Sequence, residues 1–222
     1  IIVDQNQPKM TSIIRLYTVL IANQSVQLKD PIIGECKMTL NSLCIASQST
    51  VFAGCGDMIL CFRQKEDTLQ VVARMSGIGT CIKHLVYIPP LKNGMKGEIY
   101  AGDVSKSVKL LRFSEKSKQF KLKAEEGAPR HITALARYED RFICGGDILG
   151  NIFILEYPQI PLNSDSVLDK EIFNANRRLS LKFNFFVGDS ITGVQYTRNL
   201  FSCLWYSTVS GGLGGFISVI PD

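Results

Sequence analysis

The chain has 222 residues, of which 45% are hydrophobic, 9% aromatic and 20% charged. These values are typical of a folded globular protein and argue against intrinsic disorder. The formal net charge of +5 is compatible with an acidic protein partner or an RNA-containing assembly, but it is too small to indicate either one.

No apolar run approaches the roughly 20 residues that a membrane-spanning helix needs. Residues 1–5 lack the basic and apolar regions of a signal peptide, so we expect no membrane contact. The chain does not begin with Met and stops directly after Pro221-Asp222. Both ends are therefore expected to be cuts inside a longer polypeptide.

Apolar and β-branched residues occur in runs of four to eight, separated by Gly, Asp, Asn, Ser or Pro, along almost the whole chain. This pattern is typical of β-strands. The most helix-like stretch, residues 167–179, is short. We therefore predict an all-β fold.

A unit of two apolar strands joined by a Gly-Asp turn recurs along the chain. Its copies are residues 51–62, 99–113 and 142–157, with Asp57, Asp103 and Asp147 at the turns. These aspartates are separated by 46 and 44 residues, a period typical of the four-stranded blades of a β-propeller. Each small sheet has two apolar faces, which neighbouring sheets must bury. The sequence thus predicts a β-propeller.

A long surface insertion, at about residues 158–180, follows the third copy, and a looser fourth copy lies at residues 204–222. We expect residues 1–203 to form C-terminal blades of a propeller. Residues 204–222 would form a final hairpin. About four units are too few for a closed ring, so the ring is expected to be completed by sequence outside these residues.

The chain has seven cysteines, Cys36, Cys44, Cys55, Cys61, Cys81, Cys144 and Cys203. An odd number without zinc-type spacing, mostly inside apolar strands, favours reduced structural thiols. Reduced thiols indicate a reducing compartment, cytosol or nucleus.

Few residues suit catalysis. The glycine run at 211–215 leads into a strand, whereas a phosphate-binding loop opens a helix. Only two histidines occur, His84 and His131, too few for most triads or metal sites. We therefore expect a protein that is not an enzyme, with no catalytic residue, metal, cofactor or small-molecule substrate.

The repeated aspartates have two interpretations. They could act as paired carboxylates in acid–base chemistry, or accept hydrogen bonds from backbone amides in turns. Their equivalence across repeats favours the turn role, because a residue present in every blade is usually needed by the blade. The predicted structural turn residues are Asp57, Asp103, Asp147, Gly150, Gly211 and Gly212.

Two basic clusters remain. The first consists of Lys116, Lys118, Lys121 and Lys123, and the second of Arg177, Arg178 and Lys182. A solvated face is the favoured interpretation. Contact with RNA phosphates stays an open alternative for either cluster, but no interleaved aromatic motif supports direct reading of bases.

Several segments, in order, resemble a known superfamily. They are Gly127-Ala128-Pro129-Arg130-His131-Ile132-Thr133, Gly145-Gly146-Asp147-Ile148-Leu149-Gly150-Asn151-Ile152, Val187-Gly188-Asp189 and Thr208-Val209-Ser210-Gly211-Gly212-Leu213-Gly214. The superfamily is the triple β-propeller group of splicing factor 3b subunit 3, damaged-DNA-binding protein 1 and the large subunit of the cleavage and polyadenylation specificity factor. Within it, the splicing factor 3b subunit 3 family is the most similar. The sequence departs from the family's pattern at two places. The ring of His131 is smaller than the aromatic side chain that the family usually has there, and residues 88–97 resemble a loop added to that pattern.

The resemblance implies the last blades of the third propeller, with the final hairpin helping to close a different propeller. It implies a nuclear, non-catalytic scaffold of the splicing factor 3b complex in the U2 small nuclear ribonucleoprotein. The scaffold would support branch-site recognition through protein contacts, including contacts with a helical-repeat subunit. The alternatives are an adaptor of a DNA-damage ubiquitin ligase or of the mRNA 3′-end cleavage and polyadenylation complex. We expect partner contacts on inter-strand loops, at Lys106, Arg130, His131 and Arg178.

Overall fold

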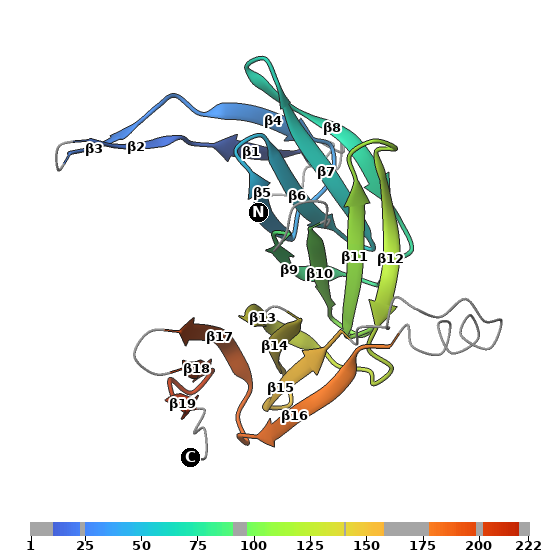
Figure 1. Ribbon diagram of the computed structural model, residues 1–222, viewed down its shortest axis with the longest axis vertical. Helices are drawn as coiled ribbons and strands as arrows, with labels where there is room; N and C mark the ends of the chain where they lie inside the picture. Colours follow the sequence, from blue (N-terminus) through green and yellow to red (C-terminus); the bar gives the residue numbers. More distant parts are fainter. Residues whose placement is uncertain are drawn as a thin grey trace, which may run out of the picture.

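The computed structural model of the protein describes residues 11–22, 25–90, 97–139, 141–157, 178–198 and 202–217. Within these ranges the chain consists of strands and contains no helix, so no described element has the form of a membrane-spanning helix (Figure 1). The strands are β1 (Ser12–Leu16), β2 (Val19–Ala22), β3 (Ser25–Leu28), β4 (Ile32–Cys36), β5 (Ser42–Ser47), β6 (Thr50–Cys55), β7 (Met58–Lys65), β8 (Thr68–Met75), β9 (Ile82–Ile88), β10 (Glu98–Asp103), β11 (Val108–Ser114), β12 (Gln119–Glu125), β13 (Ile132–Glu139), β14 (Phe142–Asp147), β15 (Asn151–Glu156), β16 (Ser180–Phe186), β17 (Ile191–Arg198), β18 (Ser202–Thr208) and β19 (Leu213–Ile217).

The strands form successive antiparallel blades. Blade 1 consists of β5–β8, blade 2 of β9–β12, blade 3 of β13–β16 and blade 4 of the described strands β17–β19. Figure 1 shows the blades following one another along an arc, with β5, β9, β13 and β17 toward its inner side. The predictions of an all-β fold, four-stranded blades and an incomplete ring are confirmed.

Apolar layers lie between the blades, and each blade contributes to the layer on either side. In blade 2, Ile99 and Leu111 pack against Phe52 and Ile59 of blade 1. Their chain neighbours Tyr100 and Leu110 belong to the next layer, together with Ile132, Ile143 and Phe153 of blade 3. Because successive strand residues point to opposite faces, a strand buried on both faces must be apolar at nearly every position.

Three glycines make room for the next blade. Gly54, Gly102 and Gly146 lie near the ends of β6, β10 and β14, and each faces the isoleucine that begins the innermost strand of the following blade: Ile82, Ile132 and Ile191. A Cβ at Gly102 would lie 2.8 Å from Cγ2 of Ile132, and one at Gly146 would lie 2.5 Å from Cβ of Ile191. A glycine in a turn often has a positive φ angle, but Gly102 and Gly146 lie in extended strands, where glycine is needed for close approach.

We predict that Gly146→Ala destabilises the junction of blades 3 and 4 by about 2 kcal/mol, because the added methyl group overpacks a buried layer. The change should lower the thermal unfolding midpoint of the full-length protein and accelerate hydrogen exchange in β17. Gly127→Ala is the control, since a Cβ there would meet its nearest atom, Nη1 of Arg178, at an ordinary 3.8 Å. Equal midpoints for the two variants would contradict this role of Gly146.

Residues 12–36 form a long hairpin, here called the N-terminal hairpin, which joins the sheet of blade 1 through a short parallel pairing of β4 with β8 at Ile33 and Thr68. β1 pairs with β4, and β2 pairs with β3. Figure 1 shows β2 and β3 extending away from blade 1. At the base of the hairpin, Ile14 and Cys36 pack with Phe62 and Leu69 of blade 1.

The C-terminal part of the described chain forms one sheet. β18 pairs with both β17 and β19, so the described part of the final hairpin adds to blade 4. A role of residues 204–222 in closing a different propeller stays a prediction. Most of the predicted insertion, residues 158–177, and most of the helix-like stretch at 167–179 lie outside the described residues. β16 begins at Ser180.

Candidate partner interface

The turns between the second and third strands of blades 2 and 3 each contain a buried aspartate. Asp103 and Asp147 are both 2% exposed. Asp103 accepts hydrogen bonds from the Thr80 hydroxyl (2.9 Å) and from the backbone amides of Thr80 (2.7 Å), Cys81 (2.7 Å), Ser105 (2.8 Å) and Lys106 (2.8 Å). Burial alone would raise the pKa of this carboxyl, but these hydrogen bonds lower it to about 2. Its carboxylate thus ties the turn of blade 2 to the segment that enters the blade.

Asp147 organises the corresponding turn of blade 3. Its carboxylate accepts hydrogen bonds from the Leu149 amide (3.0 Å), the Asn151 amide (2.9 Å) and the Asn151 side chain. Gly150 follows in this turn with φ of +90°, and a Cβ there would lie 2.8 Å from the backbone of Asp189. The turn therefore favours glycine twice, through its φ angle and through the close approach of blade 4.

The other predicted turn residues lie in more open places. Asp57 is exposed and accepts a hydrogen bond from the Gly77 amide (3.0 Å). In the final hairpin, Gly211 has φ of +85°, and the Gly212 amide donates to the Thr208 hydroxyl (3.1 Å). The sequence analysis missed Asp189, which lies in the segment that enters blade 4. Its carboxylate accepts a hydrogen bond from the Ser210 amide (3.1 Å) in the final hairpin. The Val187-Gly188-Asp189 motif was the available signal for it.

Arg130, one of the predicted contact residues, is engaged inside the protein. Its guanidinium forms ion pairs with Glu126 (2.9 Å) and Asp147 (3.5 Å), and it lies 4.7 Å from the centre of the Phe153 ring. It also donates to the side-chain oxygen of Asn184 (3.3 Å). Only 11% of the Arg130 side chain is exposed. The geometry gives Arg130 a structural role at the junction of blades 2 and 3; its role in partner contact stays a prediction.

The remaining predicted contact residues lie around the same segment, residues 126–131, which links blades 2 and 3. Lys106 and His131 are exposed. The Ser107 amide donates to the Arg130 carbonyl (3.3 Å), and the Ile148 amide donates to the His131 carbonyl (3.0 Å). Arg178 is also exposed, with its guanidinium beside Gly127. The structure thus gathers residues from three separate parts of the sequence around one inter-blade segment.

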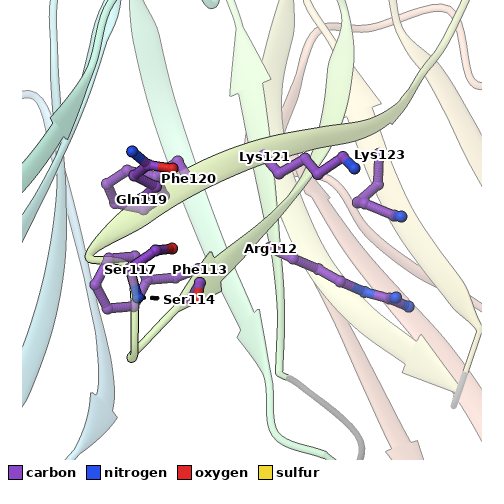
Figure 2. A pocket seen from close by; sticks show the side chains of 8 residues that line it. All are labelled: Arg112, Phe113, Ser114, Ser117, Gln119, Phe120, Lys121 and Lys123. Carbon is purple, nitrogen blue, oxygen red and sulfur yellow. Dashed lines mark hydrogen bonds between the residues drawn. The ribbon is translucent and has the colours of Figure 1, made fainter.

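A basic hollow lies along the outer strands of blade 2. It has a volume of about 390 Å³ and is lined by Arg112, Phe113, Ser114, Ser117, Gln119, Phe120, Lys121 and Lys123. Figure 2 shows Arg112, Lys121 and Lys123 extending to one side of the hairpin, away from Phe113 and Phe120. Arg112 pairs with Glu98 (2.5 Å) and lies 6.0 Å from the centre of the Tyr157 ring. The hollow can attract an anionic group, but its aromatic rings pack against blade 1, so nothing among its lining residues offers a ring for stacking with bases.

The described thiols and histidines have structural surroundings. All seven cysteines are free, and burial raises the pKa of the Cys44, Cys61 and Cys144 thiols to about 12. These three thiols are therefore protonated and unreactive at neutral pH. Burial, followed by the charge of Lys83, lowers the pKa of His84. Within the described ranges, no three His, Cys, Asp or Glu residues are grouped as a metal site would require.

Comparison with known proteins identifies the family. The model of the family described as "CPSF A subunit region" matches residues 2–222. The chain is 26% identical over 131 residues to "Probable splicing factor 3B subunit 3" of Dictyostelium discoideum, covering 54% of this chain and 10% of that protein. It is 25% identical over 183 residues to "Splicing factor 3B subunit 3" of Drosophila melanogaster, covering 77% of this chain and 14% of the relative.

A third relative is "Pre-mRNA-splicing factor RSE1" of Eremothecium gossypii, which is 32% identical over 74 residues, 33% of this chain and 6% of that protein. The chain therefore spans only a small part of the length of the relatives it matches. The resemblance drawn from the sequence motifs is confirmed, because the family model covers nearly every residue. The chain belongs to the CPSF A subunit region family.

Proposed function

We propose that the protein is a non-catalytic scaffold subunit of a splicing factor 3b-like complex in the nucleus. In the U2 small nuclear ribonucleoprotein, it would support recognition of the pre-mRNA branch site through protein–protein contacts. The observation that carries this proposal is that relatives from three organisms are all named as splicing factors. The shared family and the ordered match along the chain support the transfer of that role.

The geometry of the blades supports a binding role. Asp103 and Asp147 use their carboxylates to order turns and the segment between blades, so these turns present fixed loops to a partner. Exposed basic side chains at Lys106 and Arg178 suit acidic groups on a partner surface. We propose that the surface formed by Lys106, His131 and Arg178, here called the basic rim, contacts another subunit of the complex, such as a helical-repeat protein.

Purification of the tagged full-length protein from nuclear extract, followed by mass spectrometry, tests the assembly. We expect subunits of splicing factor 3b and other U2 proteins to be recovered in near-stoichiometric amounts. Recovery of a cullin or of polyadenylation factors in their place would overturn the proposal in favour of one of the two alternative assemblies. Depletion of the protein should also cause intron retention.

Charge reversal tests the contact surface. The triple variant Lys106→Glu, His131→Glu, Arg178→Glu should reduce recovery of the partner subunit at least tenfold, because it replaces attraction with repulsion at one rim. The control variant, Lys65→Glu with Lys116→Glu, alters two exposed lysines at the turns between the third and fourth strands of blades 1 and 2. These turns lie at the end of each blade opposite to the turn that contains Lys106. Equal recovery with both variants would remove this rim from the interface. Arg130 is left unchanged because its replacement would perturb the fold.

A further inference from the structure

The positive charge of the chain is concentrated in one hairpin, formed by β11 and β12 of blade 2. Residues 108–125 contain six lysines and arginines and two glutamates, so their net charge is +4, whereas the whole chain of 222 residues carries +5. A mixed, solvated surface would spread such an excess over many elements. The hairpin therefore contributes most of the chain's net attraction for anions.

Three of these cations lie on one side of the hairpin, at the basic hollow. Arg112 lies directly opposite Lys121 in the register of β11 and β12, and Lys123 follows two residues farther along β12. Figure 2 shows all three side chains extending away from Phe113 and Phe120. Like charges at directly opposite positions of two strands repel each other. An anion bound among them would relieve this repulsion.

The carboxylates of blade 2, residues 82–126, are committed to other partners. Its four glutamates all form ion pairs, and their partners are Arg63, Lys109, Arg112, Lys118 and Arg130. The fifth carboxylate, Asp103, accepts hydrogen bonds from its own turn and from the segment that enters the blade. Lys121 is exposed and takes part in none of these pairs. Its charge therefore has no carboxylate partner in the described part of blade 2.

Arg112 is held in place by its own blade and by blade 3. Its Nη2 and Nε atoms donate to the Glu98 carboxylate (2.5 and 3.2 Å), and its guanidinium lies 6.0 Å from the centre of the Tyr157 ring. A cation fixed in this way loses little conformational freedom when it binds an anion. Together, Arg112, Lys121, Lys123 and Glu98 have a net charge of +2, which complements the charge of about −1.5 to −2 on a phosphorylated side chain at neutral pH.

Protection of an edge strand is the alternative interpretation of the lysines. β12 is the outermost strand of blade 2, and lysines on such a strand discourage its pairing with another sheet. Any exposed lysine of β12 serves that purpose. It does not account for Arg112, which belongs to the third strand and has a side chain that is only 32% exposed. The convergence of Arg112 with two lysines of the edge strand favours a binding site.

We propose that the basic hollow binds a phosphorylated serine or threonine of another subunit in the assembly. Arg112 would contact the phosphate oxygens from its fixed position, and Lys121 and Lys123 would supply the remaining positive charge. The identity of that subunit rests on the proposed scaffold function, whereas the binding of a phosphate group by the hollow does not.

A single-stranded RNA suits the hollow less well. Proteins bind such strands in a basic groove that follows the backbone, with aromatic rings on which successive bases stack. The rings at this site, Phe113 and Phe120, pack in the apolar layer between blades 1 and 2. The hollow is a single space of about 390 Å³, which fits one phosphorylated side chain.

Fluorescence anisotropy with the purified full-length protein tests the proposal. The probe is a labelled phosphoserine peptide of degenerate sequence, and it should bind at least tenfold more tightly than the same peptide without phosphate. The double variant Lys121→Glu, Lys123→Glu should lower this affinity at least tenfold. The control, Lys116→Glu with Lys118→Glu, makes the same change of charge in the same hairpin at two residues that do not line the hollow. It should keep the affinity within threefold of the wild type, and equal unfolding midpoints would show that both variants fold.

Three results would overturn the proposal. Equal affinities for the two peptides would show that the hollow does not recognise phosphate, and equal losses in the two variants would show that only the overall charge matters. Tight binding of an oligouridylate, lost in Lys121→Glu, Lys123→Glu and unaffected by the phosphopeptide, would assign the hollow to RNA. These measurements involve no other subunit, so a negative result would leave the proposed splicing assembly standing. Recovery of a different complex from nuclear extract would, in turn, leave phosphate binding by the hollow unaffected.

Discussion

Replacement of Arg130 by methionine is expected to destabilise the junction of blades 2 and 3 by about 3–5 kcal/mol. The change removes the positive charge that neutralises Glu126 and Asp147, whose side chains are only 4% and 3% exposed. Two carboxylates would then lie in a poorly solvated site without their cation. The cation–π contact with Phe153 would also be lost.

Hydrogen–deuterium exchange of the full-length protein measures this effect locally. Peptides covering residues 126–151 and 178–186 should lose protection in Arg130→Met, and the global unfolding midpoint should fall. Arg130→Lys should recover part of the loss, because lysine keeps the charge but cannot reproduce the guanidinium's several directed hydrogen bonds. Arg178→Met is the control, since Arg178 is exposed. If Arg130→Met weakened partner binding without loss of protection, Arg130 would be a contact residue and its structural role would be wrong.

The architecture was predictable because the blades share a local sequence pattern that recurs along the chain. Blades 2 and 3 repeat an apolar strand that ends in Gly-Asp, and the separations of 46 and 44 residues between Asp57, Asp103 and Asp147 indicate the period. The equivalence of Asp57 with the other two is approximate, because the pair at the same position in blade 1 is Gly54-Cys55 and Asp57 follows two residues later. Strands that are buried on both faces also leave a clear signal, such as Phe142-Ile143-Cys144. These features depend on neighbours within one blade, which a single sequence reveals.

Contacts between blades were harder to predict. The close approach of Gly146 to Ile191 joins residues 45 positions apart, and nothing local distinguishes this glycine from a turn glycine. Arg130 was expected to face a partner because it lies in a loop. Its nearest acceptor, Glu126, is local, but Asp147 and Asn184 come from other strands, and only the folded chain shows that together they enclose the guanidinium.

The N-terminal hairpin shows a further limit of local reasoning. Its strands were predicted as part of the propeller, but their relation to blade 1 depends on which apolar faces meet. Ile14 and Ile13 have similar side chains and are neighbours in the chain, yet one is buried and the other exposed. This difference follows from the side on which the hairpin packs, and the apolar character of β1 alone does not specify it.

Asp103→Asn is expected to destabilise blade 2 by about 2–3 kcal/mol at neutral pH. An asparagine amide presents one oxygen and one NH2 group, so it cannot accept all the amide hydrogens that converge on the carboxylate from Thr80, Cys81, Ser105 and Lys106. Exchange of the amides around residues 79–81 and 105–107 measures the loss. Asp57→Asn is the matched control, because the exposed Asp57 accepts one described amide bond, from Gly77, and its replacement should cost less than about 1 kcal/mol.

The pH dependence of the free energy of unfolding, measured for the wild type and for Asp103→Asn, separates the effect of the Asp103 charge from the effect of its shape. The folded-state pKa of Asp103 is lowered from 3.8 to about 2. The ionised carboxylate therefore contributes its full stabilisation above about pH 4, and the contribution is lost as the pH falls through the folded pKa near 2. The stability difference between wild type and Asp103→Asn should consequently be constant from pH 7 to about pH 5 and shrink steadily between pH 4 and pH 2. A difference that stayed constant over the whole range would mean that asparagine fails for steric reasons, and that the converging amides do not stabilise the charge.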